Sequence, residues 1–295
     1  MSRVSTMAST VEDPMRAPIL QEFGTDLGEY DGIVVRQVTQ YSDVIAISAG
    51  ISYEAKNKYQ VFALPPGKTP PSQRRQEGSW YPTADELRNL DEIMFIQEES
   101  SFCNRVFMTC IGCLNLRPLK LHFQARGVDQ FVANRPYKLG GTCGCPLEME
   151  ILTSEDISIG RVIENFSPYG SKCFEACCKC TSYTSVLPSG SEHFKYTLRR
   201  SNCCCGRVNN CCGATCLNET LIVDILDENQ RLIGTLTRYF APGKGGEACC
   251  RAMYGFVNFS LKFPENTSAH DRMLLLSAMM AQEYQFSREG GDNDG

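Results

Sequence analysis

A short run of residues near the C-terminus restricts the possible folds more than any other feature of this sequence. Residues 273–281 are eight good helix formers interrupted only by Ser277. A helix that is apolar on every side is buried either in protein or in lipid. Nine residues span only about half of a bilayer. We therefore expect a helix over residues 269–286 that is buried inside a protein core.

The rest of the chain is predicted to form strands. Twelve tyrosines, fifteen phenylalanines and stretches rich in Val and Ile favour strands, and a hydrophobic content of 42% is enough for a sizeable core. Short strands separated by turn signals predict a barrel or a sandwich, in the all-β or α+β class. The expected strands are 32–38, 44–47, 58–63, 90–97, 119–123, 128–134, 147–152, 159–164, 194–198, 221–226 and 232–237.

The chain is expected to be one domain over 30–286, with a flexible N-terminal tail over 1–29 and a disordered C-terminal tail over 287–295. An insertion at about 64–88 begins with five prolines before residue 83. Because proline lacks a backbone donor, this segment is predicted to be a surface loop that does not pack. Its start, LPPGKTPP, is a possible polyproline ligand for protein partners, although we favour the plain loop.

The charge and the N-terminus bear on the environment of the protein. A net charge of −5 argues against nucleic acid as a partner. The basic pairs Arg74-Arg75 and Arg199-Arg200 are interpreted as solvated charges. Residues 1–20 lack the apolar core of a signal peptide, and we expect the seventeen cysteines to be reduced in the cytosol rather than paired as disulfides.

Several short segments occur in the order found in one known family. They are 57–59 (NKY), 127–136 (GVDQFVANRP), 143–151 (CGCPLEMEI), 225–228 (ILDE), 233–234 (IG) and 258–264 (NFSLKFP). In these segments the chain resembles the phospholipid scramblase family, over about residues 30–286. The resemblance implies a β-rich (α+β) fold, a closed antiparallel β-barrel of about twelve strands around a buried C-terminal helix, similar to the tubby C-terminal domain.

The resemblance also implies lipidation. In the family, a cysteine-rich run before the strand equivalent to 147–152 is thioacylated, and it matches Cys143 and Cys145 here. One acyl chain binds a membrane marginally, whereas two chains anchor a protein stably. A second candidate is the triplet Cys203, Cys204 and Cys205. The alternative is that Cys143 and Cys145 are ordinary turn cysteines.

Zinc is a competing interpretation of other cysteines. Cys110-x-x-Cys113 and Cys177-x-x-Cys180 have the ligand spacing of a tetrahedral thiolate site. No histidine lies in a cysteine cluster, so such a site would need four thiolates. We expect the cysteines to be small unligated hydrophobes or acylation sites instead.

Calcium is the possible cofactor that the resemblance implies, through an acidic loop before the final helix. This chain has Gly255 and Val257 at that position, and only Glu265 and Asp271 lie close by. A calcium site needs several oxygen ligands, so calcium regulation through this loop is doubtful. Both acids are more simply explained as residues near a helix N-terminus, favoured by the helix dipole, with Thr267 or Ser268 as the cap.

No enzymatic motif is visible: the sequence has no Gly-x-Ser-x-Gly and no phosphate-binding Gly-rich loop. We expect a protein that is not an enzyme. The resemblance implies ATP-independent, bidirectional movement of phospholipids between leaflets. It also implies a lipid anchor at the cytoplasmic face of a membrane, the plasma membrane above all. The alternatives are a lipid-anchored adaptor or lipid-binding module without transport activity, and a zinc-stabilised interaction domain.

Overall fold

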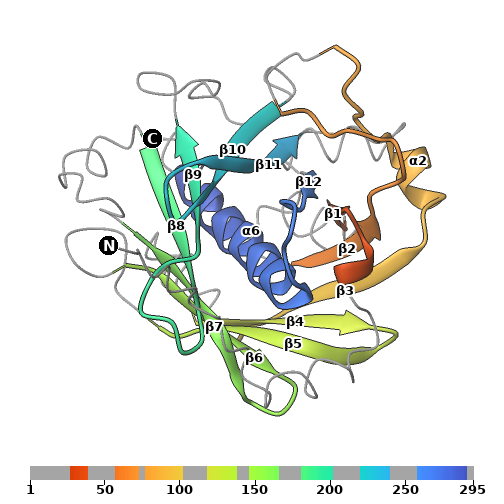
Figure 1. Ribbon diagram of the computed structural model, residues 1–295. Helices are drawn as coiled ribbons and strands as arrows, with labels where there is room; N and C mark the ends of the chain where they lie inside the picture. Colours follow the sequence, from red (N-terminus) through yellow and green to blue (C-terminus); the bar gives the residue numbers. More distant parts are fainter. Residues whose placement is uncertain are drawn as a thin grey trace, which may run out of the picture.

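Twelve antiparallel strands form a closed barrel in the computed structural model (Figure 1). The structure describes residues 27–38, 57–72, 77–101, 118–137, 146–165, 181–201, 220–239 and 258–290. Each strand pairs with its neighbours in sequence, and β1 closes the barrel against β12. The strands are β1 Gly32–Gln37, β2 Lys58–Ala63, β3 Glu92–Glu99, β4 Leu119–Ala125, β5 Val128–Arg135, β6 Glu148–Thr153, β7 Ser158–Glu164, β8 Thr181–Pro188, β9 Tyr196–Ser201, β10 Thr220–Asp227, β11 Leu232–Tyr239 and β12 Asn258–Lys262.

The strand pattern follows from alternation of apolar and polar residues. In β4, Leu119, Leu121 and Phe123 are buried, whereas Lys120 and the other intervening residues face outward. The β4–β5 turn contains Arg126 at φ 52° and Gly127 at φ 78°, which suits the twist of a two-residue hairpin. Alternation therefore places one side of every hairpin against the lumen.

The expected strands match most of the observed ones, with three differences. Strands β8 and β12 were not predicted from periodicity, and β9 begins at Tyr196, later than the expected start at residue 194. The expected strand 44–47 lies outside the described residues. β8 was missed because its sequence, TSYTSVLP, is polar on both faces and ends in proline.

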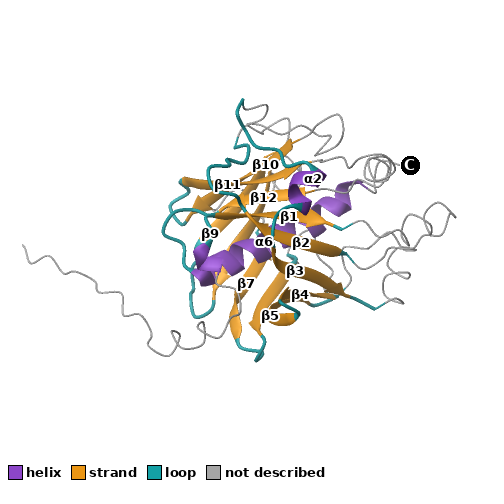
Figure 2. Cartoon of the chain, turned by 90° about the vertical axis from the view of Figure 1, so that its right-hand side faces the viewer, coloured by secondary structure: helices purple, strands orange, loops and turns teal. Residues whose placement is uncertain are grey.

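Helix α6 (Ala269–Gly290) lies inside the barrel, surrounded by strands in both views (Figures 1 and 2). All eight apolar residues of the run 273–281 are at most 9% exposed and belong to the main core. The wall approaches the helix closely at Gly160 in β7, where an added Cβ would lie 3.0 Å from Leu274 Cδ2 and 2.7 Å from the Leu187 carbonyl oxygen. The expectation of a helix buried by a β-barrel is confirmed.

The first turn of α6 is capped by Ser268. The Ser268 hydroxyl accepts from Asp271 N at 3.1 Å, and the Asp271 carboxylate accepts from Ser268 N at 3.1 Å, which makes a reciprocal capping arrangement. Asp271 Oδ1 and Oδ2 also accept from Lys195 Nζ at 2.8 and 2.9 Å. This turn is therefore tied to the β8–β9 connection.

The proline-rich β2–β3 connection packs against the outside of the barrel, so the expectation that it does not pack was wrong. Leu64 and Leu87 form a second apolar cluster with Val34 and Phe62, and Trp80 packs against it. Helix α2 (Ala84–Arg88) in this connection begins with a capping box at Thr83. The Thr237 hydroxyl donates to the Pro71 carbonyl, which satisfies a buried backbone acceptor of this connection.

The ordered domain extends slightly beyond the expected boundaries. A 3-10 helix, η2 (Leu27–Glu29), lies within the segment expected to be a flexible tail, and Leu27 is fully buried. Helix α6 continues to Gly290, past the expected start of the C-terminal tail at residue 287.

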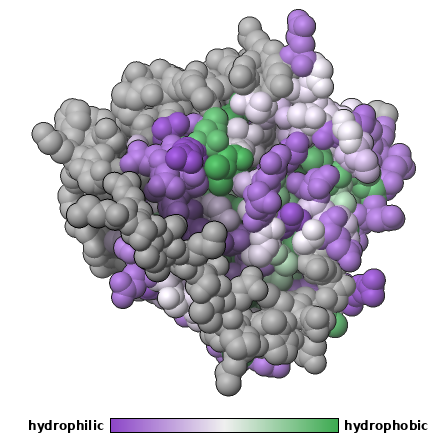
Figure 3. Space-filling model, viewed as in Figure 1, coloured by the Kyte–Doolittle hydropathy of each residue, from purple (hydrophilic) through white to green (hydrophobic). Residues whose placement is uncertain are grey.

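On the face seen in Figure 3, the described surface is mainly hydrophilic, with small hydrophobic areas. The large apolar side chains that are exposed are Val128, Tyr137, Ile157 and Leu232. Val128 and Leu232 begin β5 and β11, Ile157 lies in the β6–β7 turn and Tyr137 follows β5, and single exposed apolar residues of this kind are normal on protein surfaces. They do not by themselves mark a binding face.

Candidate functional site

The order of the strands gives the two ends of the barrel different connections. Because consecutive strands are antiparallel, the connections β1–β2, β3–β4, β5–β6, β7–β8, β9–β10 and β11–β12 all start and finish at one end. All seventeen cysteines of the sequence lie between these pairs of strands. We call this the cysteine end, and the opposite end, where α6 begins, the hairpin end.

The cysteines predicted to be functional all lie in these connections and outside the described residues. They are the lipidation candidates Cys143, Cys145, Cys203, Cys204 and Cys205, and the zinc candidates Cys110, Cys113, Cys177 and Cys180. The described strand ends therefore locate the start and finish of each connection, and the predictions for individual cysteines stay predictions.

Polar side chains line the lumen at the cysteine end. On several strands, the inward-facing residue nearest this end is charged, whereas the inward-facing residue two positions before it is apolar. Glu98 follows Ile96 in this way, Arg135 follows Ala133, and Arg238 follows Leu236. We call this layer the collar. Its members are Gln37, Asn57, Glu98, Arg135, Glu164, Thr184, Arg200 and Arg238 from the wall, with Gln282, Glu283 and Tyr284 from α6.

The collar holds α6 through hydrogen bonds. The Tyr284 hydroxyl donates to Glu98 Oε2 at 2.9 Å, and Asn57 Nδ2 donates to the same oxygen at 3.0 Å. The Ser100 hydroxyl donates to Glu98 Oε1 at 2.6 Å, and Gln282 Nε2 donates to the Thr184 hydroxyl at 2.9 Å. These bonds satisfy polar groups that burial would otherwise penalise.

The collar also contains buried charges of both signs. Arg238 Nε lies 3.2 Å from Glu283 Oε2, and burial raises the pKa of Glu283 above its usual value although Arg238 opposes the shift. Arg135 and Arg200 are 4% and 5% exposed. The interpretation of Arg200 as a solvated charge was therefore wrong. Side chains alternate between the two faces of β9, so Arg200 faces the lumen on the same side as the core residue Leu198. Its neighbour Arg199 pairs with Asp224 on the outside, at 2.8 Å.

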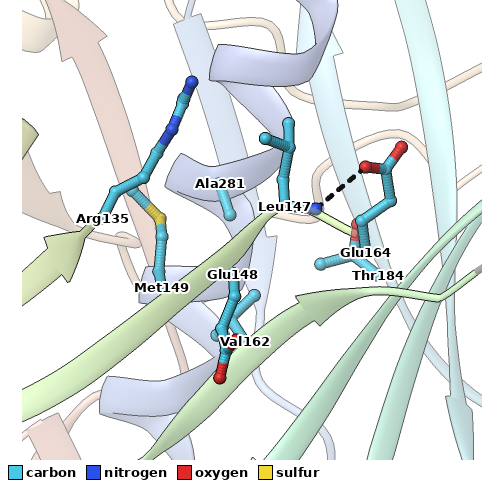
Figure 4. A pocket seen from close by; sticks show the side chains of 8 residues that line it. All are labelled: Arg135, Leu147, Glu148, Met149, Val162, Glu164, Thr184 and Ala281. Carbon is cyan, nitrogen blue, oxygen red and sulfur yellow. Dashed lines mark hydrogen bonds between the residues drawn. The ribbon is translucent and has the colours of Figure 1, made fainter. Parts of the chain in front are cut away.

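A small recess with a volume of about 10 Å³, room for about one water molecule, lies in the collar beside α6 (Figure 4). Arg135 and Glu164 lie on opposite sides of Leu147 and Ala281, and their charged ends are directed to the same side of the recess. Leu147 N donates to Glu164 Oε2 at 3.2 Å. The other lining residues are Glu148, Met149, Val162 and Thr184. The recess combines an apolar floor with one positive and one negative group at its edge.

The calcium candidates do not come together as ligands among the described residues. Both oxygens of Asp271 bind Lys195, and Glu265 is exposed on the preceding loop. Burial alone would raise the pKa of Asp271, but the Lys195 ammonium and the Ser268 hydroxyl outweigh it and hold the pKa below its usual value. In the described segments, no group of three or more His, Cys, Asp or Glu is placed to hold a metal ion.

The polyproline candidate is interrupted by a turn. Lys68 N donates to the Pro65 carbonyl at 3.1 Å, and Gly67 has φ 74°, which a continuous polyproline helix does not allow. Pro70 and Pro71 are buried against the barrel. A domain that reads polyproline would meet only Pro65 and Pro66 in their present arrangement.

Sequence reasoning missed the collar and the recess. A signal for them exists in the observed strand ends, since β5 and β7 each end with a charged residue two positions after an apolar one, Arg135 after Ala133 and Glu164 after Val162. Charged residues at strand ends are usually solvated, so this signal alone does not distinguish a lumen from a surface.

Comparisons with known proteins add no family assignment. No protein-family model, no curated protein and no solved structure matches this chain. Within the part of the chain that is described, no helix has the length and apolar character of a membrane span. The functional argument therefore depends on the two ends of the barrel.

Proposed function

We propose that this protein is a phospholipid scramblase-like protein, held by acyl chains at the cytoplasmic face of a membrane, the plasma membrane being the expected one. It would move phospholipids between leaflets in both directions without ATP. It would not be an enzyme. The observation that carries the proposal is that all seventeen cysteines lie between strands that meet at one end of the barrel. Acyl chains on any two of the five connections involved would turn the same end toward a bilayer.

The energetics of acylation support a requirement for at least two modified cysteines. Each buried methylene contributes about 0.8 kcal/mol, and a single chain gives only reversible binding. Cys143 and Cys145 precede β6 in the β5–β6 connection and would supply two chains close together. The triplet Cys203, Cys204 and Cys205 in the β9–β10 connection is the second candidate anchor.

A second candidate function is a lipid-anchored adaptor or lipid-binding module that moves no lipid. The position of α6 favours it, because the helix fills the lumen and its apolar residues are part of the main core. Removing this helix from the barrel would expose the core, so the lumen offers no path while the domain is folded. The two candidates share the anchor and differ in transport.

The deciding experiment measures fluorescent-lipid scrambling in liposomes that contain the purified, acylated protein. We expect scrambling above the protein-free rate, with the same rate with and without Ca²⁺ because Lys195 occupies the Asp271 carboxylate. Membrane binding without scrambling would leave the adaptor as the function.

The anchor is tested with Cys143→Ala/Cys145→Ala, and Cys249→Ala/Cys250→Ala serves as the matched control. Both double variants remove two thiols from connections at the cysteine end. We expect the first to lose most of its membrane fraction and the control to keep it. An unchanged membrane fraction for the first variant would exclude Cys143 and Cys145 as the anchor.

A further inference from the structure

The two ends of the barrel carry opposite charge. The six connections at the cysteine end contain nine basic and five acidic residues. The connections at the hairpin end, counted with residues 27–31 that adjoin it, contain seven basic and eleven acidic residues. The segments that continue from the two ends, residues 1–26 and 285–295, each add a net charge of −2 and leave the difference unchanged. The net charge of −5 therefore combines a basic end with an acidic end.

Described side chains next to each end show the same difference. On the outer face at the cysteine end, Lys120 is exposed and Lys58 is half-buried. Glu99 lies across from Lys120 in the β3–β4 register, but its carboxylate is bonded to His122. The turns at the hairpin end expose the acids Glu155, Asp156, Glu192 and Glu228.

The length of the barrel keeps the two charges apart. Strands β3 and β5 have eight residues each, so the two ends lie about 20 Å apart after allowing for a strand tilt of about 40°. At physiological salt, interactions between exposed charges are screened beyond about 8 Å. A charged surface that touches one end of the barrel therefore responds to the charge of that end and not to the net charge of the chain.

We propose that the cysteine end is an electrostatic docking surface for a bilayer that contains anionic phospholipid, such as phosphatidylserine. The cytoplasmic leaflet is negative and attracts basic residues near its surface. A basic surface and an acyl chain together give the two signals that stable anchoring needs. The choice of a membrane as the anionic partner rests on the proposed function, whereas the end that faces it rests on the charge distribution.

The test measures the binding of the full chain, purified without acyl chains and with its thiols reduced, to sedimented vesicles. One set of vesicles is phosphatidylcholine alone, and the other contains about one third phosphatidylserine. We expect binding to the vesicles with phosphatidylserine and none to phosphatidylcholine alone. Binding should weaken as salt is raised, because the attraction is between exposed charges.

Matched double variants identify the end that binds. Lys58→Gln/Lys120→Gln removes two positive charges at the cysteine end, where β2 and β4 begin. Arg126→Gln/Lys262→Gln removes two exposed ones at the hairpin end, in the β4–β5 turn and at the last residue of β12. We expect the first variant to bind vesicles with phosphatidylserine about tenfold more weakly and the second less than about twofold.

The conservative variant Lys58→Arg/Lys120→Arg keeps both charges and should bind as the wild type does. Equal binding to the two kinds of vesicle, equal losses in the two glutamine variants, or loss of binding in the arginine variant would each overturn the inference. If the acylated protein scrambles lipid but the chain without acyl chains does not bind phosphatidylserine, the inference fails and the proposed function stands. Binding of phosphatidylserine vesicles with these variant effects but without scrambling would uphold the docking surface in an adaptor.

Discussion

The two ends of the barrel hold the same helix by different means. At the hairpin end, the first turn of α6 is fixed by charged groups: Asp271 binds Lys195, and Arg272 Nη1 donates to the carbonyls of Leu27, Gly28 and Tyr30 at 2.8, 2.9 and 2.6 Å. At the cysteine end, the contacts described above join side chain to side chain: the Tyr284 hydroxyl donates to the buried Glu98 carboxylate, Gln282 Nε2 donates to the Thr184 hydroxyl, and Glu283 pairs with Arg238.

The difference concerns how much one residue contributes to stability at each end. Asp271 combines an ion pair with the cap of the first turn, and Arg272 binds three backbone carbonyls. We therefore expect substitutions of these two residues to lower the free energy of unfolding more than the loss of one hydroxyl at the cysteine end.

The largest effect is expected from Asp271→Ala. The change removes the cap of α6 and leaves Lys195 without its carboxylate, although half of the Lys195 side chain is exposed to solvent. We expect the free energy of unfolding at neutral pH to fall by about 3 kcal/mol, measured by denaturant titration.

Acid provides a second test of the same contact. The pKa of Asp271 is lower in the folded state than in the unfolded chain. The stabilisation by its carboxylate is therefore complete above the unfolded-state pKa and is lost as the pH falls through the folded-state pKa. Asp85→Ala, at an exposed ion pair in α2, is the control and should change stability by less than about 0.5 kcal/mol. Equal effects of the two variants would contradict the role assigned to the hairpin end.

The next effect is expected from Arg272→Lys. Lysine keeps the charge but has no second nitrogen for the bond that Arg272 Nε donates to the Thr267 hydroxyl at 3.1 Å, and it loses the contact of the guanidinium with the Phe263 ring at 5.0 Å. We expect a loss of about 2 kcal/mol in the free energy of unfolding. The control is Arg161→Lys on the outer face, where no measurable change is expected.

Much of the fold was predictable from the sequence. The run 273–281 has no polar face, so only a core on all sides could accept it, and the alternation in 119–123 identified a strand with one buried face. Closure into a barrel was not predictable from periodicity, because alternation is the same in a sandwich. The resemblance supplied it, and the pairing of β1 with β12 confirms it.

The site was predictable only in part. Composition drew attention to the cysteines, but their common location at one end follows from the strand order, which periodicity does not give. Arg200 was misread because two adjacent arginines look alike in sequence, whereas on a strand they face opposite sides. Glu98 and Glu99 show the same ambiguity: the first binds α6 and the second lies on the outer face.

A smaller effect is expected from Tyr284→Phe at the cysteine end. The change removes one hydrogen bond to Glu98, whose carboxylate keeps the bonds from Ser100 and Asn57. We expect the free energy of unfolding to fall by about 1 kcal/mol. Tyr137→Phe, at an exposed tyrosine, is the control. A loss as large as that of Asp271→Ala would remove the distinction between the two ends.

The smallest effect concerns His122, which lies on the outer face of the barrel between the two ends. Its Nδ1 lies 2.8 Å from Asp129 Oδ2, and its Nε2 lies 2.9 Å from Glu99 Oε2. Partial burial lowers the pKa of His122, but the bonds to Asp129 and Glu99 outweigh it, so the pKa is raised overall. The charged imidazole therefore stabilises the folded state.

The sign of the pH dependence follows from that shift. The contribution of His122 is complete below the unfolded pKa of about 6.5 and is lost as the pH rises through the folded value. Because both carboxylates are partly exposed, we expect the change to be below about 1 kcal/mol. Denaturant titrations across this pH range should show the loss in the wild type and in His193→Asn, a control on the exposed β8–β9 connection, and not in His122→Asn. The same slope in His122→Asn would show that the pH dependence arises from the charges at the two ends.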